Sequence, residues 1–109
     1  MKKILGIKKK YFFDIKNNLK KLEARCNYSS LSRLNVGDEI EFQYQQEVCV
    51  KIIKDIRIYH SIEDMLNKEN ITSLLPGVNS LIDALKIYSS IYSEMKVKKN
   101  GGMIVFELV

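Results

Sequence analysis

The sequence predicts an α+β fold in which several strands curl into a small barrel flanked by helices. Strand and helix patterns are intermixed along the chain, without the regular alternation of a doubly wound sheet. Two segments in the middle of the chain, 39–44 and 48–59, have strand character. With 109 residues, 46% of them hydrophobic and only one proline, the composition is that of one globular domain covering residues 1–109.

The first elements are predicted to be a strand and a helix. Residues 4–7 contain a short apolar run that ends in lysines, which favours a strand. Tyr11, Phe12 and Ile15 follow at helical spacing. Asn17-Asn18 is a poor place to continue a helix, because asparagine side chains compete for backbone hydrogen bonds. A break at the two asparagines is therefore expected.

Two interpretations are open for residues 16–26. The apolar side chains in this segment continue the helical spacing, so that one long basic helix would expose its charges to solvent. Alternatively, a strand would place Lys21, Glu23 and Arg25 on one side, where together they could bind a ligand. Local spacing does not decide between the two.

The middle of the chain predicts an antiparallel hairpin. Segment 28–33 is polar and irregular and predicts a loop before it. Apolar and polar residues alternate in 39–44, and from 48 to 59 the even positions are apolar except Lys54, where a bulge is expected. Residues 45–47 supply the hairpin loop.

Two capping patterns predict helices in the second half. Ser61 with Asp64, and Ser80 with Asp83, each place an acidic residue three positions after a serine that can begin a helix. A Leu-Pro-Gly turn at 75–77 separates the two helices. The almost entirely apolar stretch that closes the sequence predicts a central strand buried on both faces.

Charge and composition limit the classes of function. Residues 1–25 hold nine lysines and arginines against two acidic residues, while the remaining 84 residues carry a net charge of −2. A basic pole of this kind suits a polyanion such as nucleic acid, although a solvated lysine face is the alternative.

No apolar run approaches the roughly 20 residues that span a bilayer. Two separated cysteines and one histidine form no zinc or disulfide pattern. We expect an intracellular, cytoplasmic protein without metal or cofactor.

Several blocks of residues, taken in order, resemble the ASCH domain, a PUA-like family. Its signature, roughly GxKxxExR followed by a GD turn, is matched by Asn18, Lys20, Glu23, Arg25 and then Gly37-Asp38. Further blocks that resemble the small single-domain ASCH proteins are Ile56-Arg57, residues 61–66, residues 75–78, residues 91–94 and Phe106-Glu107. The similarity covers nearly the whole chain.

The resemblance implies a PUA-like mixed barrel of five to six strands flanked by two to three helices. It favours the strand in residues 16–26, and it places Lys20, Glu23 and Arg25 in a cleft. It also implies binding of RNA or a nucleotide-like ligand. Some small bacterial members of the family deacetylate acetylated cytidine, and ribonuclease activity is also associated with the family.

Two departures from the family pattern affect these expectations. Asn18 stands where the signature has glycine, and asparagine can also adopt the left-handed conformation. In the deacetylating members a lysine, a threonine and a glutamate do the chemistry; Lys20 matches the lysine, whereas Glu23 and Gly77 stand at the other two positions. The alternative function, a small hydrolase acting on modified nucleosides or RNA, would therefore depend on Lys20 and Glu23 as catalytic residues.

Arg25 is the first candidate for ligand contact. A Glu23 carboxylate can orient the guanidinium and leave its other donors for a phosphate or a base edge, although a structural ion pair is the alternative. Strand parity selects Lys21 as the neighbour of this pair, whereas the resemblance selects Lys20. We expect Lys20 in the cleft and Lys21 at a phosphate.

Two tyrosines are candidates to stack on a base. Tyr28 follows the signature, and Tyr92 lies on the apolar face of the helix predicted to begin at Ser80. Packing in the core is the alternative role for Tyr92.

Overall fold

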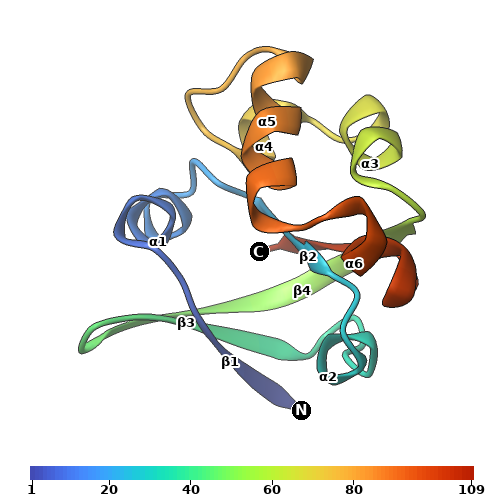
Figure 1. Ribbon diagram of the computed structural model, residues 1–109. Helices are drawn as coiled ribbons and strands as arrows, with labels where there is room; N and C mark the ends of the chain where they lie inside the picture. The colour runs from blue at the N-terminus through green and yellow to red at the C-terminus, as the bar shows by residue number, and fades with distance from the viewer.

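The computed structural model describes residues 1–109 and contains five strands and six helices (Figure 1). The strands are β1 (Lys2–Gly6), β2 (Leu22–Cys26), β3 (Glu39–Tyr44), β4 (Glu47–Tyr59) and β5 (Met103–Leu108). The helices are α1 (Lys9–Lys16), α2 (Ser29–Ser32), α3 (Ile62–Lys68), α4 (Ile71–Leu74), α5 (Leu81–Ile91) and α6 (Glu94–Lys99). The predicted α+β fold is confirmed. The helices beyond the two or three expected are α2, α4 and α6, which have only four to six residues each.

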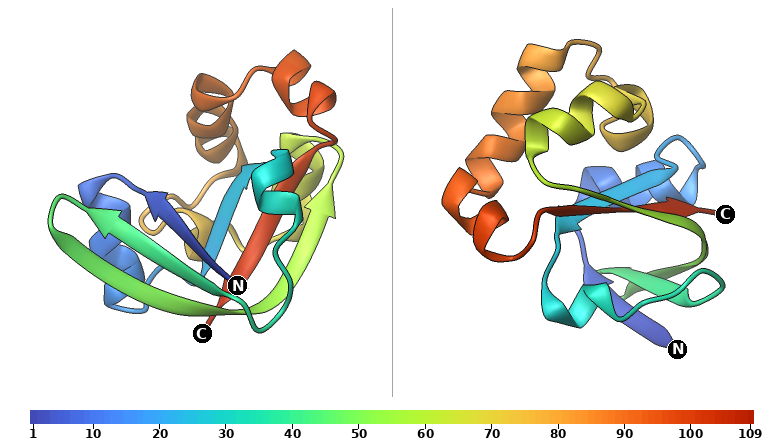
Figure 2. Two further views of the ribbon diagram at one scale, coloured as in Figure 1. Left: turned by 90° about the horizontal axis from the view of Figure 1, so that it is seen from below. Right: turned by 90° about the vertical axis from the view of Figure 1, so that its right-hand side faces the viewer.

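The strands form one curled sheet in the order β1-β3-β4-β5-β2. β1 runs parallel to β3, and the other three pairs are antiparallel. The predicted hairpin is present, with Tyr44 paired to Glu47 across a two-residue turn. Because β1 and β2 stand at the two edges and do not pair with each other, the sheet is a half-barrel with an open seam (Figure 2). This arrangement is consistent with the PUA-like fold that the resemblance implies.

The predicted bulge in β4 is present and changes which side chains face the core. The register against β5 shifts between Ile53 and Asp55. Ile53 is fully buried, whereas Val48, Val50 and Ile52 are 43–55% exposed. The even-numbered apolar positions in the first half of β4 therefore lie on the outer face of the sheet.

β5 separates two hydrophobic cores, which confirms the prediction of a central strand buried on both faces. Met103 and Val105 pack in the core that contains residues of α3, α5 and α6. Ile104 and Phe106 pack in the other core, with Phe12 of α1 inside the half-barrel. The right-hand view of Figure 2 shows β5 between the C-terminal helices and the strands β1 and β3.

The predicted helix starts are confirmed. The hydroxyl oxygen of Ser61 accepts a hydrogen bond from the Asp64 amide at the start of α3, and Ser80 accepts one from the Asp83 amide at the start of α5. α2 lies in a segment predicted as a loop. α6 was not predicted, because its capping serine is followed three positions later by lysine and not by an acidic residue.

Candidate functional site

The strand interpretation of residues 16–26 is confirmed. α1 ends at Lys16, and Asn18 has a φ of +61°, the left-handed conformation that glycine supplies in the family signature. β2 then begins at Leu22. Because successive side chains of a strand alternate, Glu23 and Arg25 point away from the core that Leu22 enters.

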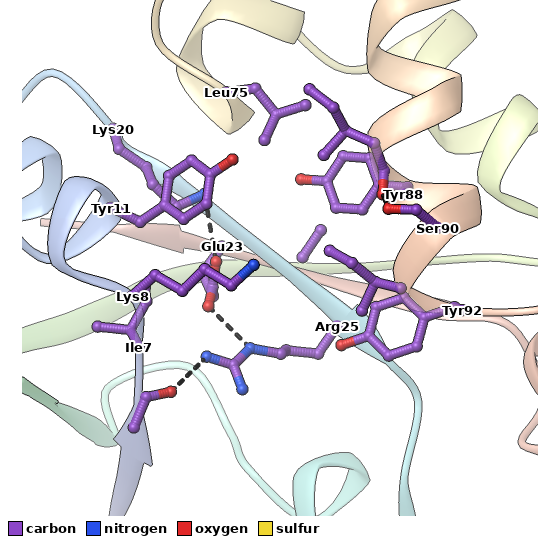
Figure 3. A pocket seen from close by; sticks show the side chains of 14 residues that line it. Ile7, Lys8, Tyr11, Lys20, Glu23, Arg25, Leu75, Tyr88, Ser90 and Tyr92 are labelled. Carbon is purple, nitrogen blue, oxygen red and sulfur yellow. Dashed lines mark hydrogen bonds and ion pairs between the residues drawn. The ribbon is translucent and has the colours of Figure 1, made fainter.

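Glu23 and Arg25 line a cavity of about 310 Å³ at the open seam of the half-barrel (Figure 3). One wall is the end of β1 and the start of α1, including Lys8 and Tyr11. The opposite wall is the second half of α5 with Tyr92, which caps that helix. The cavity therefore collects side chains from the N-terminal segment, from the family signature and from the C-terminal half of the chain.

Lys20 is buried beneath the cavity and has three acceptors. Its Nζ donates to the carbonyls of Leu22 and Leu74, at 2.7 and 2.5 Å, and lies 3.2 Å from Glu23 Oε1. Burial lowers the pKa of Lys20, and the Glu23 carboxylate offsets part of this effect. Three acceptors require all three N–H groups of an ammonium, so Lys20 has no free donor in this conformation. It joins the free edge of β2 to the end of α4.

Glu23 is the one carboxylate of the cavity and holds two cations. Its Oε1 faces Lys20, and its Oε2 accepts a hydrogen bond of 2.8 Å from Arg25 Nε. Burial opposes the charge on this side chain, but Lys20 and Arg25 together outweigh burial and hold the pKa of Glu23 below its usual value. The carboxylate is ionised at neutral pH, and each of its two oxygens faces a cation of the protein.

Arg25 is held in a fixed orientation with donors to spare. Besides the bond to Glu23, one N–H on Nη2 donates to the carbonyl of Gly6, at 3.1 Å. The side chain is 23% exposed, and its remaining N–H groups have no partner in the protein. The arrangement matches the expectation that Glu23 orients Arg25 and leaves donors for a ligand.

Four further polar side chains line the cavity and were not predicted as site residues: Lys8, Tyr11, Tyr88 and Ser90. The ammonium group of Lys8 forms no ion pair or hydrogen bond with the protein, and Figure 3 shows its side chain extending into the cavity. The hydroxyls of Tyr11 and Tyr88 point into the same space. Burial raises the pKa of Tyr88, and the Glu23 carboxylate adds to this, so the phenol stays protonated.

The remaining predicted site residues are divided between the cavity and other places. Tyr92 is 9% exposed, and it both lines the cavity and packs in the core. Tyr28 does not line the cavity; it packs against both cores, with Lys96 Nζ 5.7 Å from the centre of its ring. Lys21 is exposed and lies at a second hollow.

The second hollow contains a network of ion pairs between one arginine and three carboxylates. Arg57 donates to both carboxylate oxygens of Glu69, at 2.6 and 2.8 Å, and its Nη1 donates to Asp55 and Glu107. Tyr59 also donates to Glu69. Because Arg57 is already engaged by three carboxylates, the first cavity is the better candidate for an anionic ligand.

The structure contains neither a group of metal ligands nor a helix that could span a membrane. No three His, Cys, Asp or Glu residues lie close enough together to hold a metal ion. No helix combines the length and the apolar character needed to cross a bilayer.

Comparisons with known proteins agree with the fold and the signature. The family model of the ASCH domain matches residues 5–108. The crystal structure of hypothetical protein PH0355 is similar, with a TM-score of 0.90 and 34% identity, over 99% of this chain and 97% of that chain. The solution NMR structure of protein PF0455 from Pyrococcus furiosus is also similar, with a TM-score of 0.79 and 31% identity, over 99% of this chain and 96% of that chain. No curated protein matches. The match to the family model covers nearly the whole sequence, and the chain therefore belongs to the ASCH domain family.

Proposed function

We propose that this protein binds RNA through the cavity at the seam of its half-barrel. The observation that carries the proposal is Arg25, which lines the cavity and which Glu23 and Gly6 hold in place while its other donors have no partner in the protein. Arginine in a fixed orientation is well suited to phosphate oxygens and base edges, because its N–H groups form a planar fork.

The charge around the cavity supports this proposal. Lys8, Lys20 and Arg25 stand against one carboxylate, Glu23, so the lining carries a net charge of +2. Other lysines of the N-terminal segment are neutralised in part, since Lys2 pairs with an acidic residue. A net positive charge and unpaired donors therefore occur together at the cavity.

The hydrolase alternative is not favoured by the geometry. A lysine acts as a base only when it can present a free lone pair, and Lys20 has a hydrogen-bond acceptor for each of its N–H groups. Hydrolysis of acetylated cytidine or of RNA stays a prediction from the resemblance.

Fluorescence anisotropy with a labelled single-stranded RNA tests the proposed function. We expect the affinity to fall with salt, and Arg25→Ala to weaken binding by about 10-fold or more, since hydrogen bonds to a charged group are lost. Lys2→Ala is the matched control, because it removes one positive charge outside the cavity. Equal, small effects of the two substitutions would reduce the interaction to non-specific attraction and contradict the proposal.

A further inference from the structure

The cavity has two chemically different ends. Lys8 and Arg25 supply unpaired cationic donors at one end. The other end contains the apolar side chain of Leu75 and the hydroxyl of Tyr88. A ligand that fills this space would need a compact anionic group joined to a flat, mostly apolar group with a few polar edge atoms.

The cationic end is suited to a phosphate. Two of the five N–H groups of Arg25 are used by Glu23 and Gly6, which leaves three for a ligand. Lys8 Nζ has no partner in the protein and approaches the cavity from the opposite wall (Figure 3). No free carboxylate competes for a phosphate, because Glu23 is engaged by two cations.

The apolar end is suited to a single nucleobase. The hydroxyls of Tyr11 and Tyr88 form no hydrogen bond with the protein, and a hydroxyl can either donate to or accept from a base edge. A volume of about 310 Å³ is at the low end of the range of roughly 300–1,000 Å³ for small-molecule sites. The cavity therefore has room for one nucleotide unit and not for a run of bases.

We propose that the cavity accommodates one nucleotide, whose phosphate is bound by Arg25 and Lys8 and whose base lies toward Leu75 and the Tyr88 hydroxyl. This inference rests on the proposed function and names the unit of RNA that the cavity takes. A free mononucleotide and one nucleotide of a strand share this chemistry, and the experiment separates them.

Isothermal titration calorimetry with nucleoside 5′-monophosphates, the matching nucleosides and inorganic phosphate tests the proposal. We expect the monophosphates to bind about 10-fold or more tightly than either the nucleosides or phosphate alone, because both ends of the cavity are then filled. A nucleoside that binds as tightly as its monophosphate, or phosphate alone that does so, would overturn the assignment.

Three substitutions test which end of the cavity binds the phosphate and which end binds the base. Lys8→Ala removes an exposed side chain without a partner, so it should leave the fold intact and weaken the monophosphate about 10-fold while sparing the nucleoside. Tyr88→Phe should weaken both ligands by a similar factor. Lys21→Ala, outside the cavity, should change neither. Loss of nucleoside binding in Lys8→Ala, or equal effects of Lys8→Ala and Lys21→Ala, would contradict the placement of the phosphate.

Competition with RNA separates the sources of the ligand. If saturating monophosphate displaces a bound single-stranded RNA, the cavity takes a nucleotide of the strand; if monophosphate binds without displacing RNA, the cavity takes a free nucleotide. RNA binding that needs Arg25, without any mononucleotide binding, would overturn this inference and leave the proposed function standing. If the protein binds neither RNA nor mononucleotides, both this inference and the proposed function are wrong.

Discussion

Arg25, which projects from one edge strand of the sheet, donates a hydrogen bond of 3.1 Å to the carbonyl of Gly6 at the end of the other edge strand. A closed barrel would join these edges by backbone hydrogen bonds, which here are absent because β1 and β2 do not pair. A charged side chain and a cavity occupy the seam instead. The open seam of the half-barrel and the candidate binding site are therefore the same feature of the fold.

Replacing Lys20 by methionine is expected to destabilise the protein by about 3–5 kcal/mol, because it breaks a buried ion pair and leaves the carbonyls of Leu22 and Leu74 without their donor. Urea unfolding monitored by circular dichroism measures the change. Lys21→Met, at an exposed neighbouring position, should stay within about 0.5 kcal/mol. A loss below about 1 kcal/mol in Lys20→Met would show that Lys20 is not a structural link.

Replacing two neighbouring isoleucines of β4 by alanine should change the stability of the protein by very different amounts. Ile53→Ala should cost about 2–5 kcal/mol, since Ile53 is fully buried inside the half-barrel. Ile52→Ala should cost less than about 1 kcal/mol, because Ile52 is 48% exposed on the outer face. The same unfolding measurement compares the two variants. Similar losses of unfolding free energy at both positions would contradict the position of the bulge and the assignment of the inner and outer faces of β4.

Gly102→Ala should destabilise the protein by more than about 2 kcal/mol. A Cβ atom at this position would lie 2.1 Å from the carbonyl oxygen of Tyr59, and the φ of +109° is unfavourable for a side chain. Gly6→Ala is the control, because a Cβ there meets nothing within 4 Å. Thermal unfolding of the two variants gives the comparison, and a Gly102→Ala protein as stable as the control would contradict the close approach of the two strands.

Acid should weaken the network around Glu69. Burial works against the charge of Glu69, but the paired hydrogen bonds from Arg57 outweigh burial and lower the pKa of Glu69. A carboxyl whose pKa is lower in the folded state stabilises the fold above its unfolded pKa, and this contribution is lost as the pH falls through the folded pKa. The free energy of unfolding should therefore decrease below about pH 4.5.

Glu69→Gln separates this network from the other carboxyls. The variant should be less stable at pH 7 and should lose less stability than the wild type between pH 7 and pH 3, as measured by urea unfolding at each pH. Some acid dependence should persist, because the pKa of Glu23 is also lowered. Parallel pH profiles for the variant and the wild type would exclude Glu69 as a source of acid sensitivity.

Local patterns predicted those elements whose signals lie within a few residues. The caps at Ser61 and Ser80, the bulge near Lys54 and the end of the first helix before Asn17-Asn18 each depend on the local backbone. Which side chains of β4 face the core could not be predicted in the same way. Val50 and Ile53 are both apolar, and which of them is buried depends on the side that the curled sheet encloses.

The candidate site was predicted only in part, because its walls meet through the tertiary fold. Glu23 and Arg25 share a face if residues 22–26 form a strand, which local spacing left open and the family resemblance favoured. Lys20 lies before the first residue of β2, so strand parity did not apply to it. Lys8 and Tyr88 come from segments far apart in the sequence, and no local pattern connects them. They belong to the cavity because the end of β1 and the helix α5 face each other across the seam.

The position of β5 also constrains how the chain can fold during synthesis. Residues 103–108 form hydrogen bonds with both β2 and β4 and contribute side chains to both cores. Neither core can be completed before these residues have left the ribosome, so the preceding hundred or so residues emerge with their apolar faces uncovered. Until β5 is in place, the apolar faces that it covers stay open to self-association.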